Sequence, residues 1–181
     1  AAGAHSGELR NIYISVPASR GIFVEGGLGK SILENIVVEA TGNDGIYLIG
    51  DSNELSGIYI GDQSAQTSGN GLVLRQVNNT VVNGLFIDGG AGMQSRIVLD
   101  GSYDNQINGV NTSGTCLDYF VEWLNGASVS ADLLVGGNII RGITSGGDCG
   151  NGLVNDSTYV SFQGVNRVRE DIIGATPATR P

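Results

Sequence analysis

Three acidic residues at the ends or in the middle of short apolar stretches are the first candidates for chemistry in this chain. Asp88 ends the stretch LFID, Asp100 ends RIVLD, and Glu122 lies within YFVEW. Two neighbouring carboxyl groups can act as general acid and general base when their surroundings keep one protonated and the other ionised. Arg75 ends LVLR, and an arginine beside a carboxylate favours the ionised form. These side chains can act together only if the strands that carry them bring them close to one another.

Other kinds of site are excluded by composition. With one histidine, His5, and two cysteines, a Cys/His metal centre cannot form, and neither an EF-hand loop nor a P-loop spacing occurs. We therefore expect no metal and no cofactor. The 9 basic residues are scattered among 18 acidic ones, for a net charge of −9, which argues against nucleic acid as a partner. No apolar run approaches the ~20 residues of a membrane span.

A repeated template organises the chain. The 181 residues include 30 glycines and only 15% charged residues. Each copy of the template holds an apolar residue, two small or polar residues, an apolar-x-apolar strand, a polar loop, a glycine and a second apolar-x-apolar strand. The copies at Leu9 and Leu33 read LRNIYISVPASRGIFVEG and LENIVVEATGNDGIYLIG. Successive copies begin at residues 9, 33, 55, 82, 107 and 140.

Two short strands per copy cannot bury an apolar face alone, but stacked copies can. The template therefore predicts an all-β fold, a single-stranded right-handed parallel β-helix of about seven coils. The helix with an N-terminal lead-in segment is expected over residues 1–159, and a C-terminal capping segment and tail over 160–181. Glycine and asparagine should mark the corners, where the backbone adopts positive φ.

Strand alternation separates inward from outward residues. The inward columns are predicted to be Ile12, Ile14, Ile36, Val38, Ile58, Ile60, Leu85, Ile87 and Val110, and Ile22, Val24, Ile46, Leu48, Leu72, Leu74, Ile97 and Leu99.

The outward positions are unusually apolar. They include Tyr13, Val37, Tyr59 and Phe86 on the first strand of each copy and Phe23, Tyr47, Val73 and Val98 on the second. A row of this kind predicts a contact surface. Three alternatives are open: a homotrimer interface through Tyr13, Tyr59 and Phe86, a sugar-binding surface, or cover by the N-terminal segment or the tail after Val160.

The same columns bring candidate residues together. Asp100 and Glu122 are expected near one outward column, ~5 Å apart on adjacent coils, with Arg75 one coil below Asp100. Trp123 lies beside Glu122 and either stacks on a ligand ring or fills the coil. On the first strand, Asp88 and Glu39 are expected two coils apart, roughly 9 to 10 Å.

The two cysteines occupy the same place in their copies. Cys116 lies nine residues after Ile107, and Cys149 nine residues after Ile140. Their Cα atoms should be ~5 Å apart on adjacent coils, within reach of a disulfide. A disulfide and two reduced buried thiols both fit this placement.

The template over about Leu9 to Asp156 resembles the pectate-lyase-like β-helix superfamily, and most of all the β-helix domains of phage tailspikes. That resemblance implies a polysaccharide or glycan as partner, a homotrimer, an extracellular or virion location, and cleavage of glycosidic bonds by paired carboxylates. Asp100, Glu122 and Asp88 would be the catalytic residues, and Trp123, Arg75 and Tyr59 would bind substrate. The Gly-His-Gly motif of polygalacturonases and the calcium-binding cluster of pectate lyases are absent.

Two functional hypotheses follow from the resemblance. The first is an endo-acting polysaccharide depolymerase, a glycoside hydrolase. The alternative is a non-catalytic receptor-binding or structural module of a trimeric surface or virion protein.

Overall fold

The structure of the chain is a computed structural model. It describes residues 7–15, 19–25, 30–39, 42–61, 69–124, 138–145, 149–150, 152–155 and 167–168. All the regular elements among these residues are β-strands. Most of the expected capping segment, 160–181, lies outside the described residues.

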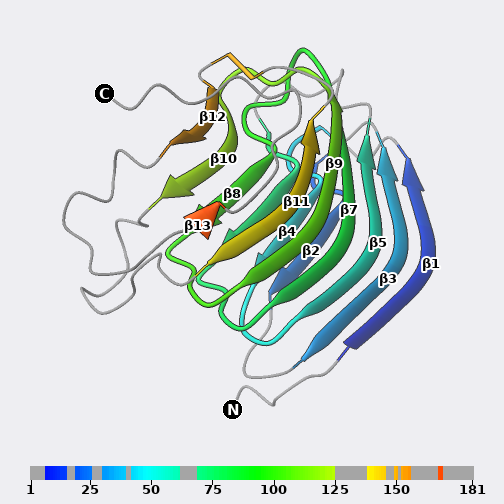
Figure 1. Cartoon of the computed structure of the whole chain (residues 1–181). Helices are drawn as coiled ribbons and strands as arrows, with labels where there is room; N and C mark the ends of the chain where they lie inside the picture. Colours follow the sequence, from blue (N-terminus) through cyan, green and yellow to red (C-terminus); the bar gives the residue numbers. More distant parts are fainter. Residues whose placement is uncertain are drawn as a thin grey trace.

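Two parallel sheets form the walls of a β-solenoid (Figure 1), which confirms the predicted all-β parallel architecture. The chain alternates between the sheets, so that each long strand is followed by a short one. Handedness and coil number stay predictions. The first sheet has the order β1 (Gly7–Ser15), β3 (Ser31–Glu39), β5 (Glu54–Gly61), β7 (Val81–Gly89), β9 (Gln106–Gly114), β11 (Ile139–Ser145) and β13 (Arg167–Val168). The second has the order β12 (Gly152–Asn155), β10 (Tyr119–Leu124), β8 (Ile97–Asp100), β6 (Leu72–Arg75), β4 (Ile46–Ile49) and β2 (Ile22–Glu25).

The pairing register follows the sequence template. Leu9 pairs with Leu33, Leu33 with Leu55, and Leu55 with Val82, and the column continues through Ile107 to Ile140. The predicted inward columns form one continuous core. Ile12, Ile14 and Val24, which belong to the first coil, are partly buried against this core, and the other predicted inward residues are buried in it.

Each long strand bends at one residue with a left-handed backbone. Asn35, two residues before Val37, has φ 53°, and the paired Gly57 has φ 59°. The bend lets Leu33 and Ile36, which are three residues apart, both face the core. Asparagine and glycine tolerate this conformation best, as the template predicts for corners. The column of bends contains Asn11, Asn35, Gly57, Gly84, Gly109 and Gly142.

Arg96 is a charged side chain within the core, which the sequence template does not predict. Arg96 is fully buried and directly precedes β8. Gly45 and Gly71 occupy the same position before β4 and β6. The Arg96 guanidinium donates to Thr112 Oγ1 and, at 2.6 Å, to the carbonyl oxygen of Gly114. In the two preceding coils, Ile60 and Ile87 lie against Gly45 and Gly71, whereas Thr112, which pairs with Ile87 on the next strand, is shorter and accepts a hydrogen bond from Arg96.

The outer face of the second sheet is covered within the chain, which corrects the expectation of an exposed apolar row there. Tyr47 is 8% exposed, Val73 4% and Val98 3%, whereas Phe23 at the end of the row is 46% exposed. The buried side chains pack together into a small cluster outside the main core, with Ile49 and Leu124 against it. The middle of this row is therefore closed to solvent, and cover by the N-terminal segment or by the tail after Val160 stays a prediction.

Candidate functional site

Asp100 and Arg75 form an ion pair on the outer face of the second sheet. They occupy paired positions on β8 and β6, and Arg75 Nε lies 3.3 Å from Asp100 Oδ2. Arg75 Nη1 also donates to Tyr47 Oη at 3.3 Å, which fixes the guanidinium from its other side. Asp100 Oδ1 is buried without a hydrogen-bond partner in the described structure. The predicted placement of Arg75 one coil below Asp100 is therefore confirmed.

Glu122 lies elsewhere than the sequence analysis placed it. The register pairs Glu122 with Val98, and Leu124 with Asp100. Glu122 is thus two residues away from the Asp100 column, so the expected separation of ~5 Å is wrong. One strand spacing and two residue rises put the two Cα atoms roughly 8 Å apart. The apolar run around Glu122 hides the alternation that would have revealed the register.

A chain of polar contacts leads along one corner of the solenoid to Glu122. Arg20 Nε donates to Asp44 Oδ2 at 3.1 Å, and Asn70 Nδ2 donates to Asp44 Oδ1 at 3.1 Å. The Ser95 amide donates to Asn70 Oδ1 at 3.0 Å, and Ser95 Oγ donates to Glu122 Oε2 at 2.8 Å. This ladder positions the Glu122 carboxylate. The recurrence of a polar residue two places before each short strand was the signal that could have identified Ser95.

Both carboxyl groups are shifted toward the protonated form. Burial raises the pKa of Asp100, and the positive charge of Arg75 partly offsets that rise. Burial also raises the pKa of Glu122, where the Ser95 hydrogen bond acts in the opposite direction and the charges of Asp118 and Asp100 add to the rise. Partly buried carboxyl groups with different partners are a common feature of acid–base sites.

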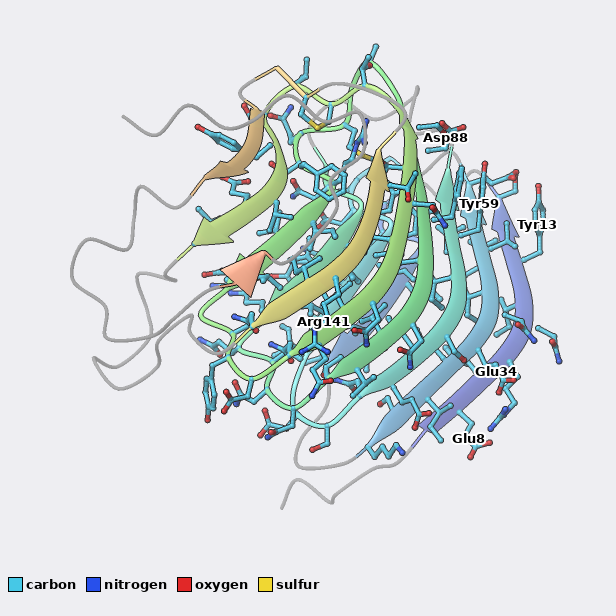
Figure 2. The ribbon with its side chains drawn as sticks, viewed as in Figure 1. Glu8, Tyr13, Glu34, Tyr59, Asp88 and Arg141 are labelled. Atoms are coloured by element: carbon cyan, nitrogen blue, oxygen red, sulfur yellow. A yellow bond between two sulfur atoms is a disulfide. The ribbon has the colours of Figure 1, made fainter. Side chains whose placement is uncertain are left out.

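The remaining predicted site residues do not form a single group with Asp100. Trp123 pairs in backbone register with Leu99, and its side chain lies outside the described part of the structure. Tyr59 and Asp88 belong to β5 and β7 of the first sheet and project from the carboxyl end of that sheet (Figure 2). The structure therefore separates Asp100, Glu122 and Arg75 on one sheet from Tyr59 and Asp88 on the other.

The first sheet carries its own aromatic group on the outside. The rings of Tyr59 and Phe86 are stacked, with centroids 5.3 Å apart and planes at 6°. Tyr13 is 64% exposed, and its hydroxyl donates to Glu39 Oε2 at 2.7 Å. On this sheet the predicted outward row remains open to solvent at Tyr13 and partly open at the stacked pair.

Cys116 and Cys149 form a disulfide between adjacent coils, with Cα atoms 4.4 Å apart. This resolves the alternative that their shared template position left open. Within the described ranges, no three histidine, cysteine, aspartate or glutamate side chains gather closely enough to hold a metal ion. The described residues also include no helix with the length and apolar character to cross a membrane.

Comparison with known proteins returned no matching family model, curated protein or solved structure.

Proposed function

We propose that this chain is the carbohydrate-engaging β-helix of a phage tailspike-like protein and that it cleaves a polysaccharide with Asp100 and Glu122. The observation that carries the proposal is the pair of half-buried carboxyl groups with raised pKa values on adjacent strands of one sheet. Hydrolysis of a glycosidic bond needs a protonated carboxyl and an ionised one.

The surroundings divide the two roles. Arg75 favours the ionised form of Asp100, because its Nε lies 3.3 Å from Asp100 Oδ2. No arginine acts on the pKa of Glu122, and the negative charges of Asp118 and Asp100 favour its protonated form. Asp100 is therefore assigned as general base and Glu122 as general acid. Arg75 is a positioning residue for Asp100.

The spacing also predicts the stereochemical course. Both side chains leave the sheet on its outer side, so a backbone separation on the order of 8 Å keeps the carboxyl groups well apart. Inverting glycosidases leave ~6.5–9.5 Å between the two carboxyl groups for a water molecule, whereas retaining enzymes hold them ~5–5.5 Å apart. The proposed reaction therefore inverts the anomeric carbon.

The test uses purified bacterial capsular and O-antigen polysaccharides, with release of reducing ends as readout. Asp100→Asn and Glu122→Gln should each lower the cleavage rate about a hundredfold or more. Glu25→Gln is the matched control, because Glu25 is exposed and lies in the same outward column as Arg75 and Asp100. Cleavage by both site variants at the wild-type rate would overturn the assignment.

The second candidate is a non-catalytic receptor-binding or structural module that trimerises through Tyr13, Tyr59 and Phe86. The exposure of Tyr13 favours it, because an exposed aromatic row is typical of contact surfaces. Sedimentation at micromolar concentration tests this candidate, and a monomer would refute it. The Cys116–Cys149 disulfide supports an extracellular or virion setting for either function, since such bonds persist in oxidising surroundings.

A further inference from the structure

We propose that the first sheet carries a second carbohydrate-binding surface, separate from Asp100 and Glu122. We call it the aromatic platform; it consists of Tyr13, Tyr59 and Phe86 with the flanking carboxylates Glu39 and Asp88. The inference rests on the proposed carbohydrate ligand, but it does not depend on cleavage.

The rings of the platform are held in place before any ligand arrives. Tyr59 and Phe86 stack across β5 and β7, and Tyr59 lies over Gly61, the residue two places further along its own strand. A Cβ atom at Gly61 would lie 2.6 Å from Tyr59 Cζ, so the missing side chain makes room for the ring. Tyr13 is anchored by its hydrogen bond to Glu39, which raises the pKa of the phenol. Rigid aromatic groups lose little conformational entropy on binding.

Hydrogen-bond acceptors line one edge of the platform. One outward column pairs Ser15, Glu39 and Gly61 on β1, β3 and β5. On the next two strands of the sheet, β7 and β9, Asp88 pairs with Ser113. Ser113 Oγ donates to Asp88 Oδ1 at 2.5 Å, and each carboxylate keeps further lone pairs for a ligand. Sugar rings present polarised C–H groups to aromatic faces and hydroxyl donors at their edges. The platform matches both features.

A second copy of the chain fits this surface less well. The cores of protein interfaces are depleted of charged residues, and juxtaposed like charges cost binding energy. Glu39 and Asp88 adjoin the rings, and the described residues of the two outward columns include no lysine or arginine to neutralise them. A neutral polyhydroxylated chain avoids that cost. Stacked coils also form an extended surface along which such a chain can lie.

The experiment measures binding of the same purified capsular and O-antigen polysaccharides by affinity electrophoresis, with sedimentation of every variant. Tyr59→Ala and Phe86→Ala should each weaken binding roughly 2- to 10-fold, as expected for the loss of one stacked ring. Phe23→Ala is the matched control, because Phe23 is an exposed aromatic residue on the second sheet. It should leave binding unchanged.

Each outcome separates this inference from the proposed cleavage. Weaker binding in the platform variants, combined with wild-type cleavage by Asp100→Asn, supports the platform and refutes the catalytic assignment. Unchanged binding in the platform variants, combined with loss of cleavage in Asp100→Asn, refutes the platform alone. A trimer that dissociates in Tyr59→Ala assigns the surface to a second copy instead. If the wild-type protein binds none of the polysaccharides, both proposals fail.

Discussion

Substitution of Gly114 tests how closely the coils are stacked. Gly114 has φ 70° and pairs with Gly89 on the neighbouring strand. A Cβ atom at Gly114 would overlap the carbonyl oxygen of Gly89 and lie 2.9 Å from its carbonyl carbon. Both obstacles are backbone atoms, so no side-chain rotation relieves them. Gly114→Ala must therefore strain its own backbone and also separate two paired strands.

Gly84 is a matched control that measures the free-energy cost of a positive φ at alanine without a steric clash. Its φ is 68°, but the nearest atom to an added Cβ is the Gly57 nitrogen at 3.9 Å. Gly84→Ala should cost only about 1 kcal/mol, because the left-handed conformation costs roughly 1–2 kcal/mol and the stiffer unfolded chain returns part of it. Gly114→Ala adds an overpacking cost of about 1–3 kcal/mol, for a total of about 2–4 kcal/mol.

Thermal unfolding followed by circular dichroism measures both effects. At about 2–4 °C per kcal/mol for a chain of this size, Gly84→Ala should lower the midpoint by a few degrees and Gly114→Ala by about 5–15 °C. Gly84→Asn should be milder than Gly84→Ala, because Asn11 and Asn35 already occupy this column. Equal midpoints for Gly114→Ala and Gly84→Ala would refute the close approach of the coils at Gly114.

Three further predictions concern the disulfide and the carboxyl groups. Cys116→Ser with Cys149→Ser should lower the free energy of unfolding by about 3 kcal/mol, because the bond closes a loop across 33 residues; a denaturant titration that matches wild type would contradict this. Ser95→Ala should raise the pKa of Glu122 further by removing a hydrogen bond that lowers it, as followed by carbon NMR of the carboxyl group; an unchanged or lower pKa would refute it. The folded state holds the protons of Asp100 and Glu122 more tightly than the unfolded chain, so stability should fall as pH rises above their ordinary pKa values of 3.8 and 4.5. Asp100→Asn should reduce that fall in melts across this range, and a pH dependence identical to wild type would count against burial as the cause.

The register of the first sheet was predictable because its template residues are unambiguous. An apolar residue, two small or polar ones and an apolar-x-apolar strand recur from Leu9 to Ile140, and each Leu, Val or Ile at the start pairs with the next. Strand alternation then assigned the core without further information. The same logic placed Arg75 beneath Asp100 correctly, since both end short apolar strands of equal length.

The rest of the site could not be derived from periodicity. Four apolar residues surround Glu122 in FVEWL, so alternation cannot choose its register. Arg96 occupies the position that Gly45 and Gly71 occupy in the two preceding coils, and nothing in its local sequence shows that a charged side chain points into the core. Periodicity also says which residues face outward but not what lies over them, which is why the burial of Tyr47 was missed.

The unbroken pairing register means that the length of this protein is adjustable in whole coils. Removing residues 46–71 would join Gly45 directly to Leu72, which already occupies the position paired with Ile46. Every remaining strand residue would stay in its own column, and the shortened stack would still present Asp100 and its neighbours above β6. The coil that contains Arg96 cannot be exchanged in this way, because a buried arginine fills part of its core. The deletion would also remove Tyr47, Tyr59 and Asn70, so a shortened stack would lose one contact of Arg75, one ring of the aromatic platform and one link of the ladder that leads to Glu122.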